Sequence, residues 1–410
     1  MERHRFDVAI IGAGPAGLMA ALHIPAGPTA VVLEKGARPG RKLLLTGAGQ
    51  CNLTAAGDIG DFEHCYGDHG RWLRPALRNL SNRDLITFFE RRGVAFSCTP
   101  EGKYFPKSLR SAEIVETLLA DLRRRGIALH RDRPVERIGV VDDRFVVHGG
   151  GDIYEAAAII IATGGKSYPQ TGSTGDGQRL ATALGHTIVP LKAALAPVTP
   201  AEHPLAPLAG NSCEEALLTV MRDGKKVHAA AGPLLITHTG FSGPLILDNA
   251  RRMEPGDTLC LAFATVRREE FLRDLIDASR GRGAIAVKNI VKDAGLTKNL
   301  REALIRHAGI DPDGRAAELT RDRFAALADA FCAFAITIKT LGGFETAMAT
   351  SGGVALTEVD PKTMMSKLVP GLFFAGEVLD IDGDTGGYNL QAAFSTGALA
   401  GRSVLLPRPV

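Results

Sequence analysis

Several features that would indicate a membrane, secreted or zinc-binding protein are missing from this sequence of 410 residues. No apolar run approaches the roughly 18 residues that a membrane-spanning helix requires. A strand pattern begins at Asp7, which leaves no space for a secretory signal. The six cysteines are scattered without a C-x-x-C pair, so no disulfide framework, zinc site or dithiol reductase is expected. We therefore expect a cytoplasmic protein with reduced thiols.

A strong excess of charge of one sign is also missing. The sequence holds 48 Lys and Arg against 45 Asp and Glu, a net charge of +3. That value is too small to indicate binding to nucleic acid or to an anionic membrane. The arginine clusters at 123–125 and 267–268 lie in helix-like stretches, which we interpret as solvated helix faces. A small-molecule substrate is expected, with neither nucleic acid nor membrane as partner, and the pattern carries no signal for the oligomeric state.

The N-terminal region, in contrast, contains a complete dinucleotide-binding pattern. Residues 7–17 read DVAIIGAGPAG, an apolar strand followed by G-x-G-x-x-G. These glycines let a tight turn approach a pyrophosphate at a helix N-terminus. A second strand at 31–33 ends on Glu34, where an acid can bind a ribose hydroxyl. Because an acid disfavours a 2′-phosphate at this position, FAD or NAD fits better than NADP.

Two later glycine-bearing segments favour FAD over NAD. Residues 370–377 read PGLFFAGE, a strand that ends in a glycine and an acid, and residues 386–394 begin a helix with GGYNLQAAF. Together they can hold a ribityl chain, phosphates and the carbonyl edge of a flavin. Residues 156–165, AAAIIIATGG, add an internal Ala-Thr-Gly motif. This combination resembles the two-dinucleotide-binding-domain flavoproteins.

The remaining pattern predicts a discontinuous α/β domain. Residues 1–190 alternate strands with helices, and the helices expected at 81–93 and 111–126 each end at a glycine. Several prolines between 190 and 207 then mark an exit from this domain, followed by short strands and a charged helical stretch. The chain therefore carries a β unit with a helical insert between two parts of the flavin domain.

A more specific resemblance comes from loop 41–54, RKLLLTGAGQCNLT. It resembles the signature loop of a bacterial and archaeal FAD-binding flavoprotein family that includes aminoacetone oxidases and bile-acid (dehydro-steroid) reductases. The resemblance implies an α/β fold class, with a Rossmann-like FAD domain, an inserted β-barrel-like domain and a helical subdomain. The expected division is 1–190 and 355–410 for the FAD domain, 191–265 and 329–354 for the barrel-like cap domain, and 266–328 for the helical insert.

The loop departs from the family pattern at two positions. The family usually has Gly-Gly-Gly-Arg-Cys-Asn, whereas Ala48 and Gln50 here replace a glycine and the arginine. FAD binding is expected to survive because Gly47, Gly49 and Asn52 remain. The loop nevertheless lacks the cation that the arginine would supply beside the flavin or substrate.

Each glycine-bearing segment contributes candidate cofactor-binding residues. Glu34 and Lys35 are placed for the adenosine half, and Glu377 for the ribityl or phosphate side. The backbone N–H groups of Asn389 and Leu390 can bind the pyrimidine edge, next to a positive helix end. The full predicted set is Gly12, Gly14, Ala16, Gly17, Glu34, Lys35, Arg41, Gly47, Asn52, Val135, Thr163, Gly164, Glu377, Gly387, Asn389 and Leu390.

No residue is assigned as catalytic from the sequence. His238, in a Gly-rich turn, and Tyr388 are candidate proton donors, although His238 equally fits a turn-capping role. Cys51 has no adjacent histidine to lower its pKa, so we interpret it as a packing residue. The aspartates at 380, 382 and 384 fit turn roles better than a metal site, and no metal is expected.

These observations predict an FAD-dependent oxidoreductase, with NAD(P)H-linked reduction of a C=C bond in an organic substrate as the leading reaction. Only one complete G-x-G-x-x-G unit is visible, so no separate nicotinamide domain is evident. One alternative is an amine oxidase of the aminoacetone type that uses oxygen. Another is an FAD-holding protein of tRNA modification or redox sensing.

Overall fold

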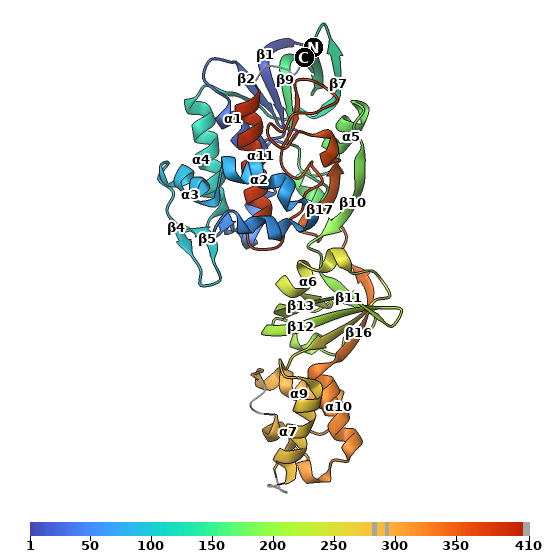
Figure 1. Ribbon diagram of the computed structural model, residues 1–410. Helices are drawn as coiled ribbons and strands as arrows, with labels where there is room; N and C mark the ends of the chain where they lie inside the picture. Colours follow the sequence, from blue (N-terminus) through green and yellow to red (C-terminus); the bar gives the residue numbers. More distant parts are fainter. Residues whose placement is uncertain (281–284, 292–294, 405–410) are drawn as a thin grey trace. The chain divides into compact units, whose positions relative to one another are not determined.

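The computed structural model describes residues 1–280, 285–291 and 295–404, which belong to two compact units (Figure 1). Unit 1 contains residues up to 194 and from 344 onward, and unit 2 contains residues 195–343. The sequence placed the two divisions at 190/191 and 354/355. The structure instead divides the chain at 194/195 and 343/344. The boundaries differ because β10 (Ile188–Ala194) and β17 (Ala349–Val354) pair with each other inside unit 1.

A mixed sheet of order β6-β2-β1-β9-β8-β7, with β18 also paired to β9, forms the centre of unit 1. The bounds of its strands are β1 (Arg3–Ile11), β2 (Ala30–Leu33), β6 (Ala128–His130), β7 (Val135–Val141), β8 (Arg144–Gly149), β9 (Asp152–Ile161) and β18 (Leu372–Phe374). Strands β6, β2, β1, β9 and β18 run parallel, and Ile11, Leu33, Ile161 and Phe374 stand in register at their carboxyl ends. All three glycine-bearing segments therefore leave the sheet at one edge.

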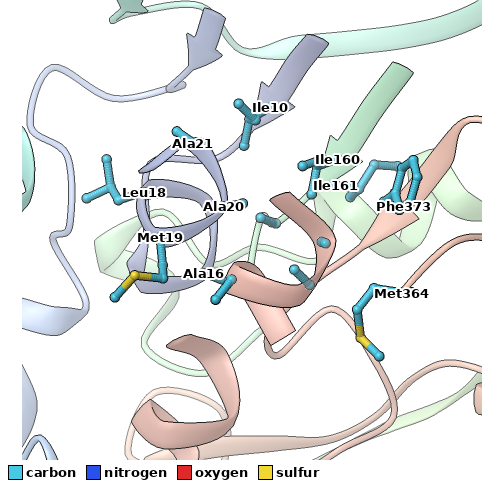
Figure 2. Close-up of a cluster of buried hydrophobic side chains, with 14 of the residues drawn as sticks. Ile10, Ala16, Leu18, Met19, Ala20, Ala21, Ile160, Ile161, Met364 and Phe373 are labelled. Atoms are coloured by element: carbon cyan, nitrogen blue, oxygen red, sulfur yellow. The ribbon is translucent and has the colours of Figure 1, made fainter. Parts of the chain in front are cut away.

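Helices α1 (Pro15–His23) and α11 (Tyr388–Ser403) pack closely together. A Cβ atom at Gly397 would lie 2.3 Å from the carbonyl oxygen of Ala16, so only glycine allows this separation. Figure 2 shows part of the cluster that α1 forms with the sheet, including Leu18, Met19 and Ile160, all buried. Burial of each large aliphatic side chain stabilises the unit by roughly 1.5–3 kcal/mol.

The other helices and short strands of unit 1 surround this core. Helix α3 (Asn82–Glu90) begins at Ser81, whose side chain forms a reciprocal capping box with Asp84, and the helix predicted at 81–93 is confirmed. The remaining elements are η1 (Leu43–Gly49), β3 (Thr54–Ala55), η2 (Asp61–His69), α2 (Gly70–Asn79), β4 (Phe96–Cys98), β5 (Lys103–Pro106), α4 (Ser111–Arg124), η3 (Pro169–Thr171), α5 (Asp176–Ala183) and η7 (Leu356–Glu358). Across the described chain, no helix is both long and apolar enough to span a bilayer.

Unit 2 combines a closed barrel with a group of helices. The barrel order is β11-β14-β13-β12-β15-β16. Strand β16 (Phe334–Leu341) alternates buried and exposed residues, and its Phe334 and Ile336 share one apolar core with Leu304 and Phe331 of the helices. The other bounds are β11 (Val198–Pro200), η4 (Ala206–Leu208), β12 (Ser212–Arg222), β13 (Lys225–Ile236), β14 (Phe241–Ser242), α6 (Pro244–Leu247), η5 (Ala250–Arg252), β15 (Thr258–Ala262), α7 (Arg268–Arg280), α8 (Val287–Ile290), α9 (Lys298–His307), η6 (Ala316–Glu318) and α10 (Arg321–Cys332). The predicted fold class, an α/β protein with a barrel-like and helical insertion, is confirmed.

Candidate cofactor site

A pocket in unit 1 lies where the parallel strands end, and residues from all three glycine-bearing segments line it. This is the expected ligand position in an open α/β sheet. Twelve of the sixteen predicted residues stand on its wall: Gly12, Gly14, Ala16, Glu34, Lys35, Arg41, Val135, Thr163, Gly164, Glu377, Asn389 and Leu390.

The other four predicted residues lie off the wall. Gly17 and Gly387 serve close packing, because a Cβ atom would lie 1.9 Å from the Gly12 carbonyl oxygen and 2.7 Å from the Thr54 Cα, respectively. A Cβ atom at Gly47 would likewise lie 2.9 Å from the backbone nitrogen of Asn52, which is the fourth of these residues. A contact of these residues with the cofactor stays a prediction.

The start of α1 forms an open anion-binding surface. Gly14 is its N-cap residue without a side-chain cap, and a Cβ atom there would meet nothing within 4 Å. The first N–H groups of a helix have no partner inside the helix, and the helix dipole makes this end positive. Open space above such a helix end suits the pyrophosphate of a dinucleotide.

Two acidic residues at this edge are held by specific donors. The Glu34 carboxylate accepts hydrogen bonds from the backbone N–H groups of Ala13 and Gly36, each at 2.9 Å. Lys35 forms an ion pair with Asp176, with 2.6 Å between Nζ and Oδ2. The N-cap residue of α5 is Gly175, and Asp176 follows it as the first helical residue.

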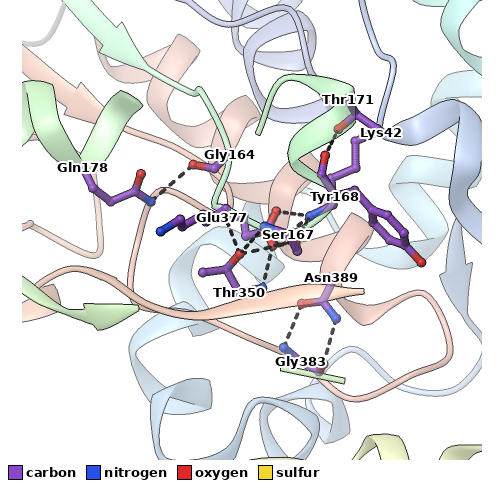
Figure 3. A network of polar contacts seen from close by, with 11 residues as sticks. Lys42, Gly164, Ser167, Tyr168, Thr171, Gln178, Thr350, Glu377, Gly383 and Asn389 are labelled. Atoms are coloured by element: carbon purple, nitrogen blue, oxygen red, sulfur yellow. Dashed lines mark hydrogen bonds and ion pairs between the residues drawn. The ribbon is translucent and has the colours of Figure 1, made fainter. Parts of the chain in front are cut away.

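The start of α11 is a second helix end on the pocket wall. Its first intrahelical bond runs from the Gln391 N–H to the Gly387 carbonyl, so the N–H groups of Asn389 and Leu390 precede the helical ladder. The Asn389 side chain both accepts from and donates to the Gly383 backbone, at 2.9 and 2.7 Å (Figure 3). Because these two hydrogen bonds occupy the Asn389 side chain, its backbone N–H is the group that can bind a ligand.

The groups on the wall fit FAD. Two helix N-termini supply backbone N–H donors, and Glu34 is an acid of the type that binds a ribose hydroxyl. The Thr163 hydroxyl oxygen is buried against α5, where a Cβ atom at Gly177 would lie 2.0 Å from it.

Sequence reasoning missed a polar cluster that includes Lys42, Ser167 and Thr350. The Lys42 Nζ lies 2.7 and 2.9 Å from the two Glu377 carboxylate oxygens and also donates to the Ser167 hydroxyl (Figure 3). The Thr350 N–H donates to Glu377 at 2.7 Å. Lys42 belongs to the loop that resembles the family, but no sequence signal indicated that it or Thr350 meets Glu377.

The two candidate catalytic residues belong to different units. His238 is exposed in the turn between β13 and β14 of unit 2. Tyr388 opens α11 in unit 1 but does not line the pocket, and its ring packs edge-on against Phe62 and Tyr66. A role in proton transfer stays a prediction for both.

Cysteine and aspartate side chains near the site have other environments. Cys51 is fully buried, and burial raises the pKa of its thiol to about 12, which fits packing rather than nucleophilic chemistry. Burial also raises the pKa of the Asp380 carboxyl, whose Oδ2 lies 3.8 Å from His69 Nε2. In the described part of the chain, no group of three His, Cys, Asp or Glu residues could hold a metal ion.

Comparison with known proteins identifies the family. The family profile described as "HI0933-like protein Rossmann domain" matches residues 6–403. The chain is 31% identical over 409 residues to the 3-dehydro-bile acid delta(4,6)-reductase of Clostridium scindens, covering 97% of this chain and 98% of that protein. It is also 31% identical over 410 residues to the ribosomal RNA dihydrouridine synthase of Escherichia coli, covering 96% of each.

Among solved structures, a 3-ketosteroid delta1-dehydrogenase from Sterolibacterium denitrificans matches with a TM-score of 0.53 and 12% identity. The match covers 98% of this chain and 99% of that one, and it concerns the fold alone. The family match and the pocket together lead to one conclusion: this chain belongs to the HI0933-like family and is an FAD-dependent oxidoreductase.

Proposed function

We propose that this protein reduces a C=C bond conjugated to a carbonyl group in an organic substrate, with NAD(P)H as the electron donor. The supporting observation is a bond type shared by two relatives with different names. In a 3-dehydro bile acid, delta(4,6) double bonds are conjugated to the C3 ketone. In uridine, the C5–C6 bond that is saturated in dihydrouridine is conjugated to the C4 carbonyl. Both bonds accept hydride at the carbon remote from the carbonyl group.

The pocket residues would bind and orient the cofactor. Bound FAD supplies the hydride-transfer chemistry. The open end of α1 at Gly14 would hold the diphosphate, and Glu34 the adenosine ribose. The N–H groups of Asn389 and Leu390 would hold the carbonyl edge of the flavin.

Anaerobic mixing of the purified yellow protein with NADH or NADPH tests this reaction. We expect rapid bleaching near 450 nm (an approximate general property of flavins), slow recovery in air, and fast recovery with a 3-keto-4-ene steroid or uridine-containing RNA. Absence of bleaching by either nicotinamide would contradict the proposal. Bleaching by amines with peroxide release would then favour an amine oxidase, and no bleaching by any donor would favour redox sensing.

Uridine in RNA is a second candidate substrate, and the local distribution of charge favours it. Residues 70–125 carry 12 Lys and Arg against six Asp and Glu, which leaves 36 against 39 for the rest of the chain. Arg91, Arg92, Arg123 and Arg124 lie at the C-terminal ends of α3 and α4, where both Arg92 and Arg124 contact Asp121. The pKa of Arg92 is lowered, first by burial and then by Arg124 and Arg91. Residues 70–125 therefore form a basic region, although the net charge of the whole chain is only +3.

A paired charge reversal distinguishes RNA binding from helix-end stabilisation by these arginines. For Arg91→Glu with Arg123→Glu, we expect weaker binding to a ribosomal RNA fragment and a salt slope reduced by about 2, roughly 1 per phosphate contact. Arg267→Glu with Arg273→Glu, two exposed positions of unit 2, makes the same charge change and is the control. An equal loss of RNA affinity in both double variants, or no RNA binding by the unaltered protein, would contradict an RNA substrate and favour the small-molecule substrate.

A further inference from the structure

Lys42 and Glu377 form an ion pair in the wall of the cofactor pocket, from segments 335 positions apart in the chain. Their side chains are only 22% and 19% exposed. Ser167 and Thr350 are both completely buried, and each donates a hydrogen bond to Glu377. The Ser167 hydroxyl donates to Glu377 Oε1 at 3.0 Å, and the Thr350 hydroxyl donates to Ser167 at 3.3 Å. The cluster therefore joins four separate segments of unit 1.

Most of the acceptor capacity of Glu377 is used within this cluster. Its Oε1 atom accepts from Lys42, Ser167 and the Thr350 N–H, and its Oε2 atom accepts from Lys42. A carboxylate offers about four lone-pair positions. Contact of Glu377 with the ribityl or phosphate side of the cofactor stays a prediction, and the contacts that the structure shows hold its carboxylate in the pocket wall.

The backbone next to the cluster accommodates it closely. A Cβ atom at Gly165 would lie 2.4 Å from the Thr350 hydroxyl oxygen and 3.1 Å from the Glu377 carboxyl carbon. Any larger residue would displace Thr350 or Glu377. The Thr350 hydroxyl also accepts from the backbone N–H groups of Lys166 and Ser167, at 2.8 and 3.0 Å. The position of Glu377 is thus determined by several independent contacts.

Positive charge is in excess on the pocket wall, which is lined by three carboxylates and by five cations, Lys35, Arg38, Arg41, Lys42 and Arg133. Its carboxylates are each balanced: Glu34 by two backbone N–H groups, Asp176 by Lys35, and Glu377 by Lys42. Lys42 is less exposed than Lys35, 22% against 32%, so solvent and salt screen its charge less. Gln50, which replaces the family arginine, is exposed and lies off the wall.

We propose that Lys42 is a fixed cation of the cofactor pocket, and that Glu377, Ser167 and Thr350 are positioning residues that hold its ammonium group. The proposal depends on FAD binding and not on the reaction proposed above, because it concerns cofactor affinity and potential. Its tests therefore remain valid whichever substrate is reduced.

Replacement of Lys42 tests the charge of the cation. For Lys42→Met, we expect FAD to bind the apoprotein at least about tenfold more weakly, about 1.4 kcal/mol, and the flavin midpoint potential to become more negative. Both effects follow from a carboxylate left uncompensated on the wall. Lys42→Arg should restore affinity to within about threefold (under about 0.7 kcal/mol). Lys107→Met removes an exposed lysine elsewhere and should change neither quantity.

Replacement of Glu377 tests the positioning role. Glu377→Gln removes the anion and leaves Lys42 in place, so the midpoint potential should shift in the opposite direction from that of Lys42→Met. Unchanged affinity and potential in Lys42→Met would overturn the proposal. Equal affinity losses in the Met and Arg variants, with a less stable apoprotein, would also overturn it, because they would indicate packing rather than charge.

Discussion

His23 is a partly buried titratable residue at the end of α1. Its Nδ1 atom lies 2.9 Å from the Met19 carbonyl oxygen, and its ring stacks on Phe88. Burial lowers the pKa of His23 to about 4, with Arg402 among the nearby cations that lower it further. The unfolded chain, with a pKa near 6.5, binds this proton more readily than the folded protein. Stability is therefore complete above about pH 6.5 and declines as pH falls toward 4.

Substitution of His23 should reduce this sensitivity to acid. Between pH 7 and 5, protonation of His23 in the unfolded state should lower the free energy of unfolding by about 2 kcal/mol. Denaturant titrations at both pH values measure the loss, which should be smaller by this amount in His23→Leu. If acid lowers the free energy of unfolding equally in the unaltered protein and in His23→Leu, other titratable groups cause the loss.

Another buried histidine shows why connectivity alone does not define a catalytic site. Ser366 bonds to the His186 Nε2 at 2.9 Å, and the His186 Nδ1 lies 3.1 Å from Glu358, as in a hydrolase triad. Ser366 is only 2% exposed, however, and its hydroxyl also accepts from the Leu368 and Val369 N–H groups. These contacts anchor the segment before β18, and no substrate can reach the hydroxyl.

At the scale of elements, the α1–α11 contact links helix packing to the cofactor pocket. Both helices begin on the pocket wall, and Gly401 and Gly397 of α11 lie against the α1 backbone. A Cβ atom at Gly401 would be 2.1 Å from the carbonyl oxygen of Ala20, which cannot move without its helix. The separation of these helices thus determines the positions of both helix ends that would hold the cofactor.

Gly401→Ala should therefore destabilise the protein, against the usual effect of this substitution in a helix. Helix propensity alone would add roughly 0.5–1 kcal/mol of stability. Overpacking against a backbone atom typically costs about 1–3 kcal/mol, so we expect a net loss and weaker FAD binding. Thermal unfolding with and without FAD measures both effects. Gly139→Ala, where a Cβ atom meets nothing within 4 Å, is the control, and an equally stable Gly401→Ala would contradict the close contact.

At the scale of the whole molecule, the two units have separate apolar cores. All residues of the cofactor pocket belong to unit 1. A ligand that binds only the folded state stabilises it by RT ln(1 + [L]/Kd), about 2.7 kcal/mol at a concentration of 100 Kd. FAD should therefore stabilise unit 1 directly.

Hydrogen exchange of the apoprotein and the FAD-saturated protein tests this expectation. Amides of β1, β9 and α11 should gain protection with FAD, whereas those of β12 and β15 should change little. Lys42→Met, for which weaker FAD binding is expected, should reduce the gain in proportion to its loss of affinity. Equal protection in both units would show that their folding is coupled, contrary to the expectation from separate cores.

The sequence alone determined the local patterns and the class of protein. Apolar strand runs, glycines at positions 12 and 14, and the acid at 34 predicted the dinucleotide site, because these signals depend on backbone conformation within short segments. Gly387 was predicted to bind the cofactor but does not line the pocket. A glycine can be required either for close packing or for the approach of a ligand, and the sequence does not distinguish the two reasons.

Only the tertiary structure determined which side chains meet. The Lys42–Glu377 and Lys35–Asp176 pairs join distant segments, and the basic helix ends at Arg91 and Arg123 are not apparent from net charge. Pairing of β10 with β17 likewise moved the division between the units. Long-range contacts depend on how the strands order and the helices pack, and a periodic pattern in one segment carries no information about its partner.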